Sequence, residues 1–216
     1  NKTDAADAEA ICEAVTRPNM RFVQIKTEEQ QAVLALHTER GILIRERIAC
    51  ANSLRATLAE FGITIAAGQS HLTRELPAIL EDGENGLSPF VRTSIYRQSK
   101  HIRELEEQVK QVEEALASWY RTQEACQRMA KIPGVGMLTA TYVVAAVGNA
   151  RQFSTAKQFA SWLGLTPKEH SSGGKQQLGG ISKRGDGYFR YLQLRNLLLS
   201  LRLIYILLDL LLHLYR

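Results

Sequence analysis

The chain has 216 residues, of which 45% are hydrophobic and 23% charged, which is ordinary for a folded protein with one large core or two small ones. Its three cysteines lie far apart without a CxxC pair, which excludes a disulfide framework and a Cys/His zinc site and indicates buried thiols in a cytoplasmic protein. The formal net charge is +5, and residues 151–190 hold seven basic residues against two acidic ones. That stretch therefore carries the whole net charge and predicts a surface for phosphate groups.

The first 61 residues are expected to be helical around one short strand. Residues 4–15 have helical spacing, residues 21–26 are typical of a strand, and a long helix is expected from Thr27, which forms a capping-box pattern with Gln30. Gly62 is expected to end that helix. Its apolar stripe comprises Val33, Leu36, Leu43, Leu54, Leu58 and Phe61, and its solvated face comprises Arg40, Arg45, Glu46 and Arg47. The alternative for these arginines is contact with nucleic acid.

A heptad pattern dominates the middle of the chain. Residues 62–90 contain Gly83, Gly86 and Pro89 and are predicted to be a loop-rich connection. From Ser94 to about Tyr120, apolar residues alternate three and four apart, which is typical of a coiled-coil seam. The seam comprises Ile102, Leu105, Val109, Val112, Leu116 and Trp119, with Gln98 and Ile95 extending it backwards. This helix pairs either with the helix at 27–61 or with another subunit.

The last third of the chain is punctuated by glycine. A turn at 133–136 is predicted between two helices, the second one slim and ended by Gly148, and Ser154 is expected to cap a helix at 155–163. Residues 167–187 are predicted to be loop with a short hairpin around 177–181, and a last helix starts near Asp186. The tail at 191–216 holds thirteen leucines but is interrupted by Arg195, Arg202 and Asp209, so it predicts no membrane span and is either a buried helix or a sequence not selected for this fold.

The motif Ile132-Pro133-Gly134-Val135-Gly136 matches a helix-hairpin-helix turn. The amides of such a turn, with the N-terminus of the helix that follows, can bind a DNA phosphate without reading the base sequence. We therefore predict that Gly134, Val135 and Gly136 contact nucleic acid. The alternative is a plain packing turn between two helices.

Two further groups of residues have the chemistry of a phosphate-handling enzyme. Ser172 lies in a glycine-rich loop, where a hydroxyl can approach a phosphodiester, and nearby cations could stabilise charge on the phosphorus centre. These cations are Lys175, Lys183, Arg184 and Arg190; the alternative is a loop serine among solvated charges. Asp4 and Asp7 share one helix face and could hold Mg²⁺, although acidic residues are common in any first helical turn.

These motifs, in this order, resemble DEDD insertion-sequence transposases that end in a serine-bearing domain, of the IS116/IS110/IS902 type and most closely the IS1111 branch of the IS110 group. The resemblance covers about residues 1–190 and is carried by residues 2–8, 17–23, 132–140, 159–167, 171–175 and 181–185. It implies a RuvC-like, RNase-H-like domain in which Asp4 and Asp7 are the last two of four acidic Mg²⁺ ligands. It also implies that Ser172 forms a covalent phosphoseryl link to DNA, that a structured non-coding RNA guides the reaction, and that the enzyme is a homo-oligomer.

The sequence departs from that family at both ends. The family's first Asp and its Glu would precede Asn1, and the leucine-rich tail does not match, so we expect a truncated or frameshifted copy. We predict a mainly α chain with the end of a RuvC-like domain and a long helix at 1–61, a loop and coiled-coil linker at 62–125, a helix-hairpin-helix serine domain at 126–190 and the tail at 191–216. We expect a bacterial, nucleoid-associated transposase. The alternatives are a catalytically dead DNA-binding module and a structural coiled-coil protein, and Ser171 remains an alternative nucleophile to Ser172.

Overall fold

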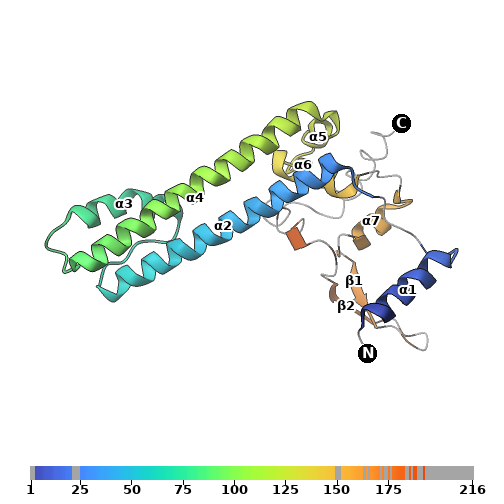
Figure 1. Cartoon of the computed structure of the whole chain (residues 1–216), viewed down its shortest axis with the longest axis horizontal. Helices are drawn as coiled ribbons and strands as arrows, with labels where there is room; N and C mark the ends of the chain where they lie inside the picture. The colour runs from blue at the N-terminus through green and yellow to red at the C-terminus, as the bar shows by residue number, and fades with distance from the viewer. Residues whose placement is uncertain are drawn as a thin grey trace.

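The computed structural model describes residues 3–20, 25–148 and 152–162, and then residues 164, 166–170, 172, 175, 177–182, 185, 187, 188 and 192. These residues are mainly helical, as predicted. Two long helices form a hairpin, and the shorter C-terminal elements gather at one end of it (Figure 1). Most of the predicted strand at 21–26 and nearly all of the tail lie outside the described residues, as does Asp186, although the following Gly187 and Tyr188 are helical as predicted.

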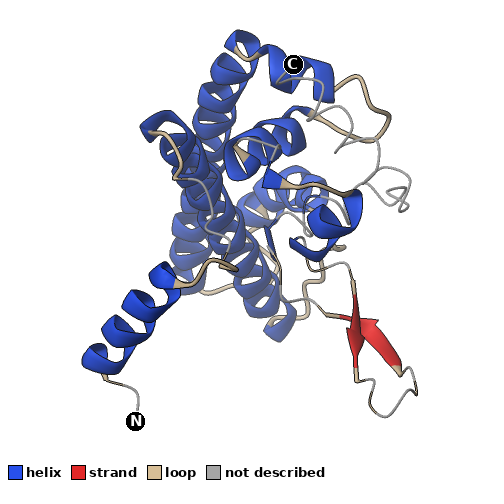
Figure 2. Cartoon of the chain, turned by 90° about the vertical axis from the view of Figure 1, so that its right-hand side faces the viewer, coloured by secondary structure: helices blue, strands red, loops and turns tan. Residues whose placement is uncertain are grey.

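Helix α1 (Asp4–Thr16) confirms the expected first helix. It begins at Thr3, whose Oγ1 accepts a hydrogen bond from the Ala6 amide at 3.3 Å. None of its residues is buried, and Ile11 and Val15 are 64% and 62% exposed. Figure 2 shows α1 projecting away from the other helices. The apolar face of α1 therefore has no cover within the described part of the chain, and the exposed Cys12 corrects the expectation of a buried thiol there.

Helices α2 (Glu28–Glu60) and α4 (Pro89–Thr122) run antiparallel and pack along most of their length (Figure 1). The capping box that starts α2 is present: Thr27 Oγ1 accepts from the Gln30 amide at 3.2 Å, and Gln30 Oε1 accepts from the Thr27 amide at 3.0 Å. Gly62 follows the end of α2 with a φ of +76°, as predicted for a stop signal. The predicted seam of α4 is buried at Ile95, Ile102, Leu105, Val109, Val112 and Leu116.

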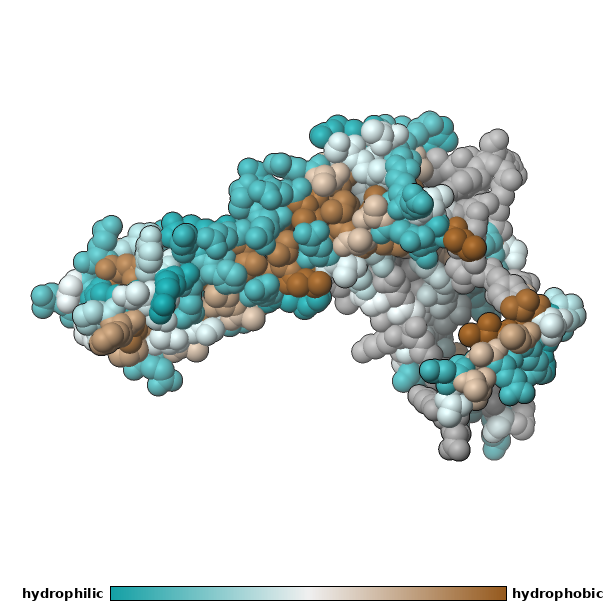
Figure 3. Space-filling model, in the orientation of Figure 1, coloured by the Kyte–Doolittle hydropathy of each residue, from teal (hydrophilic) through white to brown (hydrophobic). Residues whose placement is uncertain are grey.

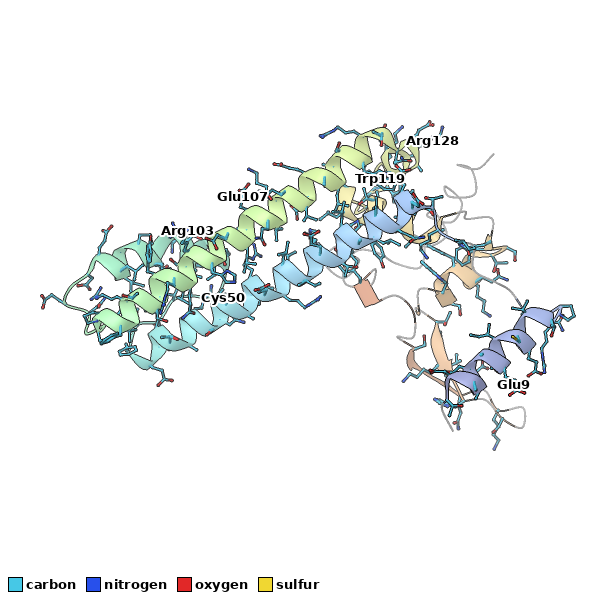
Figure 4. All side chains as sticks on the ribbon, viewed as in Figure 1. Glu9, Cys50, Arg103, Glu107, Trp119 and Arg128 are labelled. Atoms are coloured by element: carbon cyan, nitrogen blue, oxygen red, sulfur yellow. The ribbon has the colours of Figure 1, made fainter. Side chains whose placement is uncertain are left out.

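The heptad pattern is thus satisfied within one chain, by the helix at 28–60. Figure 3 shows apolar surface along the hairpin, flanked by hydrophilic residues. The inner end of the α2–α4 hairpin is the end beside the shorter C-terminal elements. There, the Trp119 indole Nε1 donates to Glu29 Oε1 at 2.6 Å, which joins the end of α4 to the first turn of α2 (Figure 4). Pairing with a second subunit, the other alternative, stays a prediction.

The expectation of a loop-rich segment at 62–90 is wrong in its centre, where helix α3 (Gln69–Glu81) forms. Leu72 and Leu76, four residues apart, bury one face of α3 against the outer end of the hairpin. This burial offsets the missing amide of Pro77, which lies inside the helix. A cavity of about 320 Å³ remains between α3 and α4, lined mainly by apolar side chains.

Helices α5 (Glu124–Met129) and α6 (Met137–Val147) form the centre of the C-terminal region. Every residue of α6 from Thr139 to Val147 is buried, and the small side chains predicted to keep it slim let it pack closely against α2, α4 and α5. Gly148 ends it with a φ of +60°, as predicted. Cys126 lies in the same core, where burial raises the pKa of its thiol to about 12.

The remaining elements are short. Helix α7 (Ala156–Trp162) follows a cap in which Thr155 Oγ1 accepts from the Gln158 amide, so the cap is one residue later than the predicted Ser154. Strands β1 (Pro167–Glu169) and β2 (Leu178–Ile181) pair antiparallel, with Pro167 opposite Ile181 and Glu169 opposite Leu178. The predicted hairpin is therefore present, and its first strand lies in a stretch that was predicted to be loop. No helix in the described part of the chain is long and apolar enough to cross a bilayer.

Candidate nucleic-acid interface

The turn before α6 is anchored by its apolar residues and exposes its glycines. Ile132 and Val135 are each 5% exposed and belong to the C-terminal core, and the Val135 amide donates to the Ile132 carbonyl at 3.0 Å. Gly134 adopts a φ of +86°, which favours glycine, and has open space around it. Among the three residues predicted to contact nucleic acid, Val135 therefore holds the turn in place, while Gly134 and Gly136 lie on the surface.

The start of α6 has the electrostatic character of an anion site. Gly136 precedes the helix without a side-chain cap, and its carbonyl accepts from the Ala140 amide at 2.9 Å. The amides of the first turn carry the positive end of the helix dipole, which favours a phosphate oxygen. The turn and the helix N-terminus could therefore accept an anion, and the helix-hairpin-helix assignment stays a prediction.

Ser172 lies at the tip of the β1–β2 hairpin. Beyond the two strands, the His170 amide donates to the Gln177 carbonyl at 2.9 Å and the Lys175 amide donates to the Ser172 carbonyl at 3.1 Å. Ser172 and Lys175 therefore face each other across the closing turn, and both are exposed. At the base of the hairpin, Ser182 Oγ donates to the Gly164 carbonyl at 3.2 Å and ties the second strand to the end of α7.

Of the predicted cations, the structure places only Lys175 beside Ser172, because Lys183, Arg184 and Arg190 lie outside the described residues. The pair thus brings one hydroxyl and one ammonium group to an exposed tip. A hydroxyl in that position can be reached by an extended phosphodiester backbone, and an ammonium group stabilises negative charge on phosphate oxygens.

Asp4 and Asp7 lie in the first turn of α1 and are exposed. Two carboxylates suit Mg²⁺, which usually takes one or two from the protein and completes its shell with water and phosphate oxygens. Within the described residues no third His, Cys, Asp or Glu joins them in a group that could hold a metal ion. Figure 2 shows α1 and the β1–β2 hairpin on opposite sides of the chain, so the structure does not bring Asp4 and Asp7 beside Ser172.

The sequence did not predict that two polar side chains, His37 and Arg40, are buried at the inner end of the α2–α4 hairpin. Arg40, predicted to be solvated, is 4% exposed, and its Nε and Nη2 atoms both lie 2.7 Å from Glu113 Oε1 of α4. His37, one turn earlier on α2, is 0% exposed. The neighbouring prediction holds for Arg45 and Glu46, which are exposed.

The burial of His37 and Arg40 could have been predicted from their spacing along α2, although not from their residue types. Counting from the buried Val33 in alternating steps of four and three reaches His37, Arg40, Ile44 and Arg47, and then the buried Ala51, Leu54 and Leu58. The seam of α2 thus includes three polar residues, whereas that of α4 is almost wholly apolar. Polar residues at such positions are the ones that specify how two helices pair.

Burial also sets the charge states of this group. Desolvation, with the positive charge of Arg40 beside it, lowers the pKa of His37 from 6.5 to about 4, so its imidazole is neutral at physiological pH. Desolvation opposes the charge of Arg40, but hydrogen bonds with Glu113 and the Tyr188 hydroxyl outweigh it and raise the pKa of the guanidinium. The group therefore contains a neutral imidazole next to a permanent cation.

Comparison with known proteins finds similarity to transposases. Residues 126–200 match the model of the Transposase IS116/IS110/IS902 family. The chain is 42% identical over 193 residues to a probable family 20 transposase of Pseudomonas aeruginosa, covering 89% of this chain and 57% of that protein. It is 43% identical over 192 residues to the transposase for insertion sequence element IS1111A of Coxiella burnetii, covering 89% and 53%.

A third relative, the transposase for insertion sequence element IS1328 of Yersinia enterocolitica, is 41% identical over 192 residues, covering 89% of this chain and 57% of that protein. The chain thus spans a little over half the length of each of these three relatives. The turn before α6, the Ser172 hairpin and Tyr188 all lie inside the segment that matches the family model. Residues 126–200 are thus similar to the IS116/IS110/IS902 transposase family, and 89% of the chain is similar to parts of these three transposases.

Proposed function

We propose that this chain belongs to a DNA recombinase that cuts and rejoins strands through Ser172. The observation that carries the proposal is the position of Ser172, exposed and paired with Lys175 at a hairpin tip, inside the segment that matches the transposase family. The relatives are named as transposases of insertion sequences, which supports DNA as the substrate. The basic stretch at 151–190 supplies the charge that a phosphate backbone needs.

The proposed chemistry is a transesterification. The Ser172 hydroxyl oxygen attacks the phosphorus atom of a phosphodiester, and a phosphoseryl bond forms as one phosphorus–oxygen bond of the DNA breaks. The hydroxyl proton is released to water, and the departing DNA oxygen gains a proton. Because one phosphoester is exchanged for another, the reverse step can rejoin a strand, and Lys175 stabilises the charge on the phosphate oxygens.

The other parts of the proposal come from the family resemblance. Asp4 and Asp7 would hold Mg²⁺, which supplies charge neutralisation at the phosphate when it is bound. The amides at Gly134 and Gly136 and the first turn of α6 would position the DNA backbone. A structured guide RNA would select the target, and the enzyme would act as a homo-oligomer.

The test is a covalent adduct between the full chain and labelled DNA that carries the ends of its own insertion sequence, with Mg²⁺ present. We expect the wild-type chain and Ser171→Ala to give an adduct on a denaturing gel, and Ser172→Ala to give none. Ser171→Ala is the matched control because the two serines are adjacent in the sequence. An adduct that survives Ser172→Ala assigns the nucleophile elsewhere.

A second candidate function is a DNA-binding module without cleavage activity. It is favoured by the isolation of Asp4 and Asp7 within the described residues, where no further carboxylate joins them. In this case the chain binds duplex DNA with strong salt dependence but never forms an adduct. Fluorescence anisotropy at several salt concentrations measures that binding, and Lys175→Ala should lower the salt slope by about 1 if Lys175 contacts one phosphate.

A further inference from the structure

A chain of hydrogen bonds links the buried imidazole of His37 to two other parts of the molecule. His37 Nε2 lies 3.1 Å from Thr141 Oγ1 of α6, and His37 Nδ1 lies 3.3 Å from the Tyr188 hydroxyl. Both Tyr142 and Tyr188 also pack their rings edge-on against the imidazole, at centroid distances of 5.2 and 5.6 Å. His37 and Thr141 are both 0% exposed, so each polar atom depends on its protein partner.

The direction of each bond follows from the groups that can only accept. Thr141 Oγ1 lies 2.9 Å from the Met137 carbonyl and 3.1 Å from the Leu138 carbonyl, so its hydrogen is donated to the backbone. His37 Nε2 must then carry the hydrogen that it shares with Thr141. That tautomer leaves Nδ1 as an acceptor for the Tyr188 O–H, while the Tyr188 oxygen accepts from the Arg40 guanidinium.

The two ends of this series of hydrogen bonds adjoin the two segments of the candidate interface. Met137 is the first residue of α6 and directly follows the turn that exposes Gly134 and Gly136. Tyr188 follows the base of the Ser172 hairpin, which is fixed at Ser182, by only six residues. Arg40 adds a bond to Glu113, so α4 is attached at the same point.

We infer that His37 and Tyr188 are positioning residues, which hold the turn before α6 and the segment after the Ser172 hairpin in one fixed arrangement on α2. The inference deepens the proposed function and rests on it, because it states how the DNA-backbone contact and the nucleophile are kept in a constant relation. In this role, the two side chains act through the segments they hold and not through contact with DNA. A displacement of about 1 Å between such groups can slow a reaction about a hundredfold, so bonds of defined direction are needed there and apolar packing is not sufficient.

The first test is hydrogen exchange on the full chain without DNA, in two variants that cut the hydrogen-bond chain at opposite ends. Tyr188→Phe removes one hydroxyl and keeps the ring, and Thr141→Val removes the other hydroxyl and keeps the shape. We expect Tyr188→Phe to raise exchange about fivefold at residues 137–141, and Thr141→Val to do the same at residues 177–188, as for one lost buried hydrogen bond. Tyr96→Phe, at a 55% exposed tyrosine of α4, is the control and should change neither.

If His37 couples the two segments, each variant raises hydrogen exchange at the segment far from its own substitution. A purely local role of these hydroxyls does not give that result. If each variant raises exchange only near its own substitution, the two segments are not coupled through His37 and the inference is wrong. The result does not depend on catalysis, so it stands or falls even if the wild-type chain forms no DNA adduct and the proposed function fails.

The second test applies when the wild-type adduct forms. Tyr188→Phe should slow adduct formation about tenfold or more while the dissociation constant for DNA stays within about twofold, because the charges that bind the backbone are untouched. Tyr96→Phe should leave both quantities unchanged. An unchanged rate in Tyr188→Phe, or a rate that falls only in proportion to DNA binding, overturns the positioning role.

Discussion

The two halves of the α2–α4 hairpin are held together by different means. In the outer half, the cluster around Leu54, Leu58 and Ile95 is apolar, and Ser99 is the one buried polar side chain among its described residues. The inner half buries His37 and Arg40 beside Leu105, Val109 and Leu116. Apolar contacts have no direction and supply stability, whereas the buried polar bonds are satisfied in one arrangement only. The half that adjoins the candidate interface is the half that contains them.

The largest expected effect on stability comes from a substitution in the apolar core of the outer half. Leu54 is 0% exposed, so Leu54→Ala should lower the free energy of unfolding by about 2–5 kcal/mol through lost burial and a cavity. Ile48→Ala, at a 48% exposed site on the same helix, should change it by less than about 0.5 kcal/mol. Urea unfolding followed by circular dichroism measures both. Equal losses at the two sites would contradict the assignment of the outer half to apolar burial.

Acid should weaken the inner half next. The folded pKa of His37 is about 4 and the unfolded value 6.5, so the unfolded state binds more protons between these pH values. The stability is fully present above pH 6.5 and is lost as the pH falls, by about 2.5 kcal/mol at pH 4.5. Urea unfolding at pH 7.5 and 4.5 should show a smaller pH-dependent loss in His37→Gln than in the wild type. The same loss in both proteins would assign it to other groups.

A medium effect concerns the loop at the outer end of the hairpin. The Arg92 guanidinium donates to the carbonyls of Leu87 and Leu80, at 3.2 and 3.0 Å, and to Asn85 Oδ1 at 2.6 Å. Lysine cannot span these acceptors, so Arg92→Lys should cost about 1–2 kcal/mol in unfolding free energy. Arg97→Lys, at an exposed position of the same helix, is the control. If the two substitutions have equal effects, apolar packing alone holds α3 and this loop in place.

The smallest expected effect is at the inner end, on the surface. Glu29→Gln keeps an acceptor for the Trp119 indole and removes only the charge, so it should lower the free energy of unfolding by less than about 0.5 kcal/mol. Thermal unfolding at low and high salt measures the difference, which should shrink as salt screens the charge. A loss above 1 kcal/mol would mean that this surface bond contributes as much as the buried group.

Local signals in the sequence predicted the helices well. Thr27 with Gln30 and the following Gly62 gave the bounds of α2, and the spacing from Ile95 to Leu116 gave the buried face of α4. Helix α3 was missed because glycines flank it and Pro77 interrupts it, so its two buried leucines did not make a visible pattern. Its stability depends on a surface formed by distant residues.

The candidate site was predictable only in its local parts. The glycine pattern identified the turn before α6, and Ser172 was recognised from its neighbours. The burial of Arg40 was not predicted, because a charged residue was assigned to solvent although its spacing placed it on the seam. Its partners Glu113 and Tyr188 are 73 and 148 residues away, and no short-range pattern joins them.

Two arginine–glutamate ion pairs cross the α2–α4 hairpin, and their spacing has a consequence for how the hairpin can assemble. Arg40 pairs with Glu113 and Arg47 with Glu106, so the pairs are one heptad apart on each helix and run in opposite directions. Sliding α4 by one heptad in one direction would leave Arg47 opposite Glu113 but Arg40 opposite Tyr120. Sliding it in the other direction would leave Arg40 opposite Glu106 but Arg47 opposite Ser99. Either shift leaves one guanidinium in the seam without a carboxylate partner, which is costly. This spacing of charges therefore sets the antiparallel register, which the leucines and valines alone would leave open.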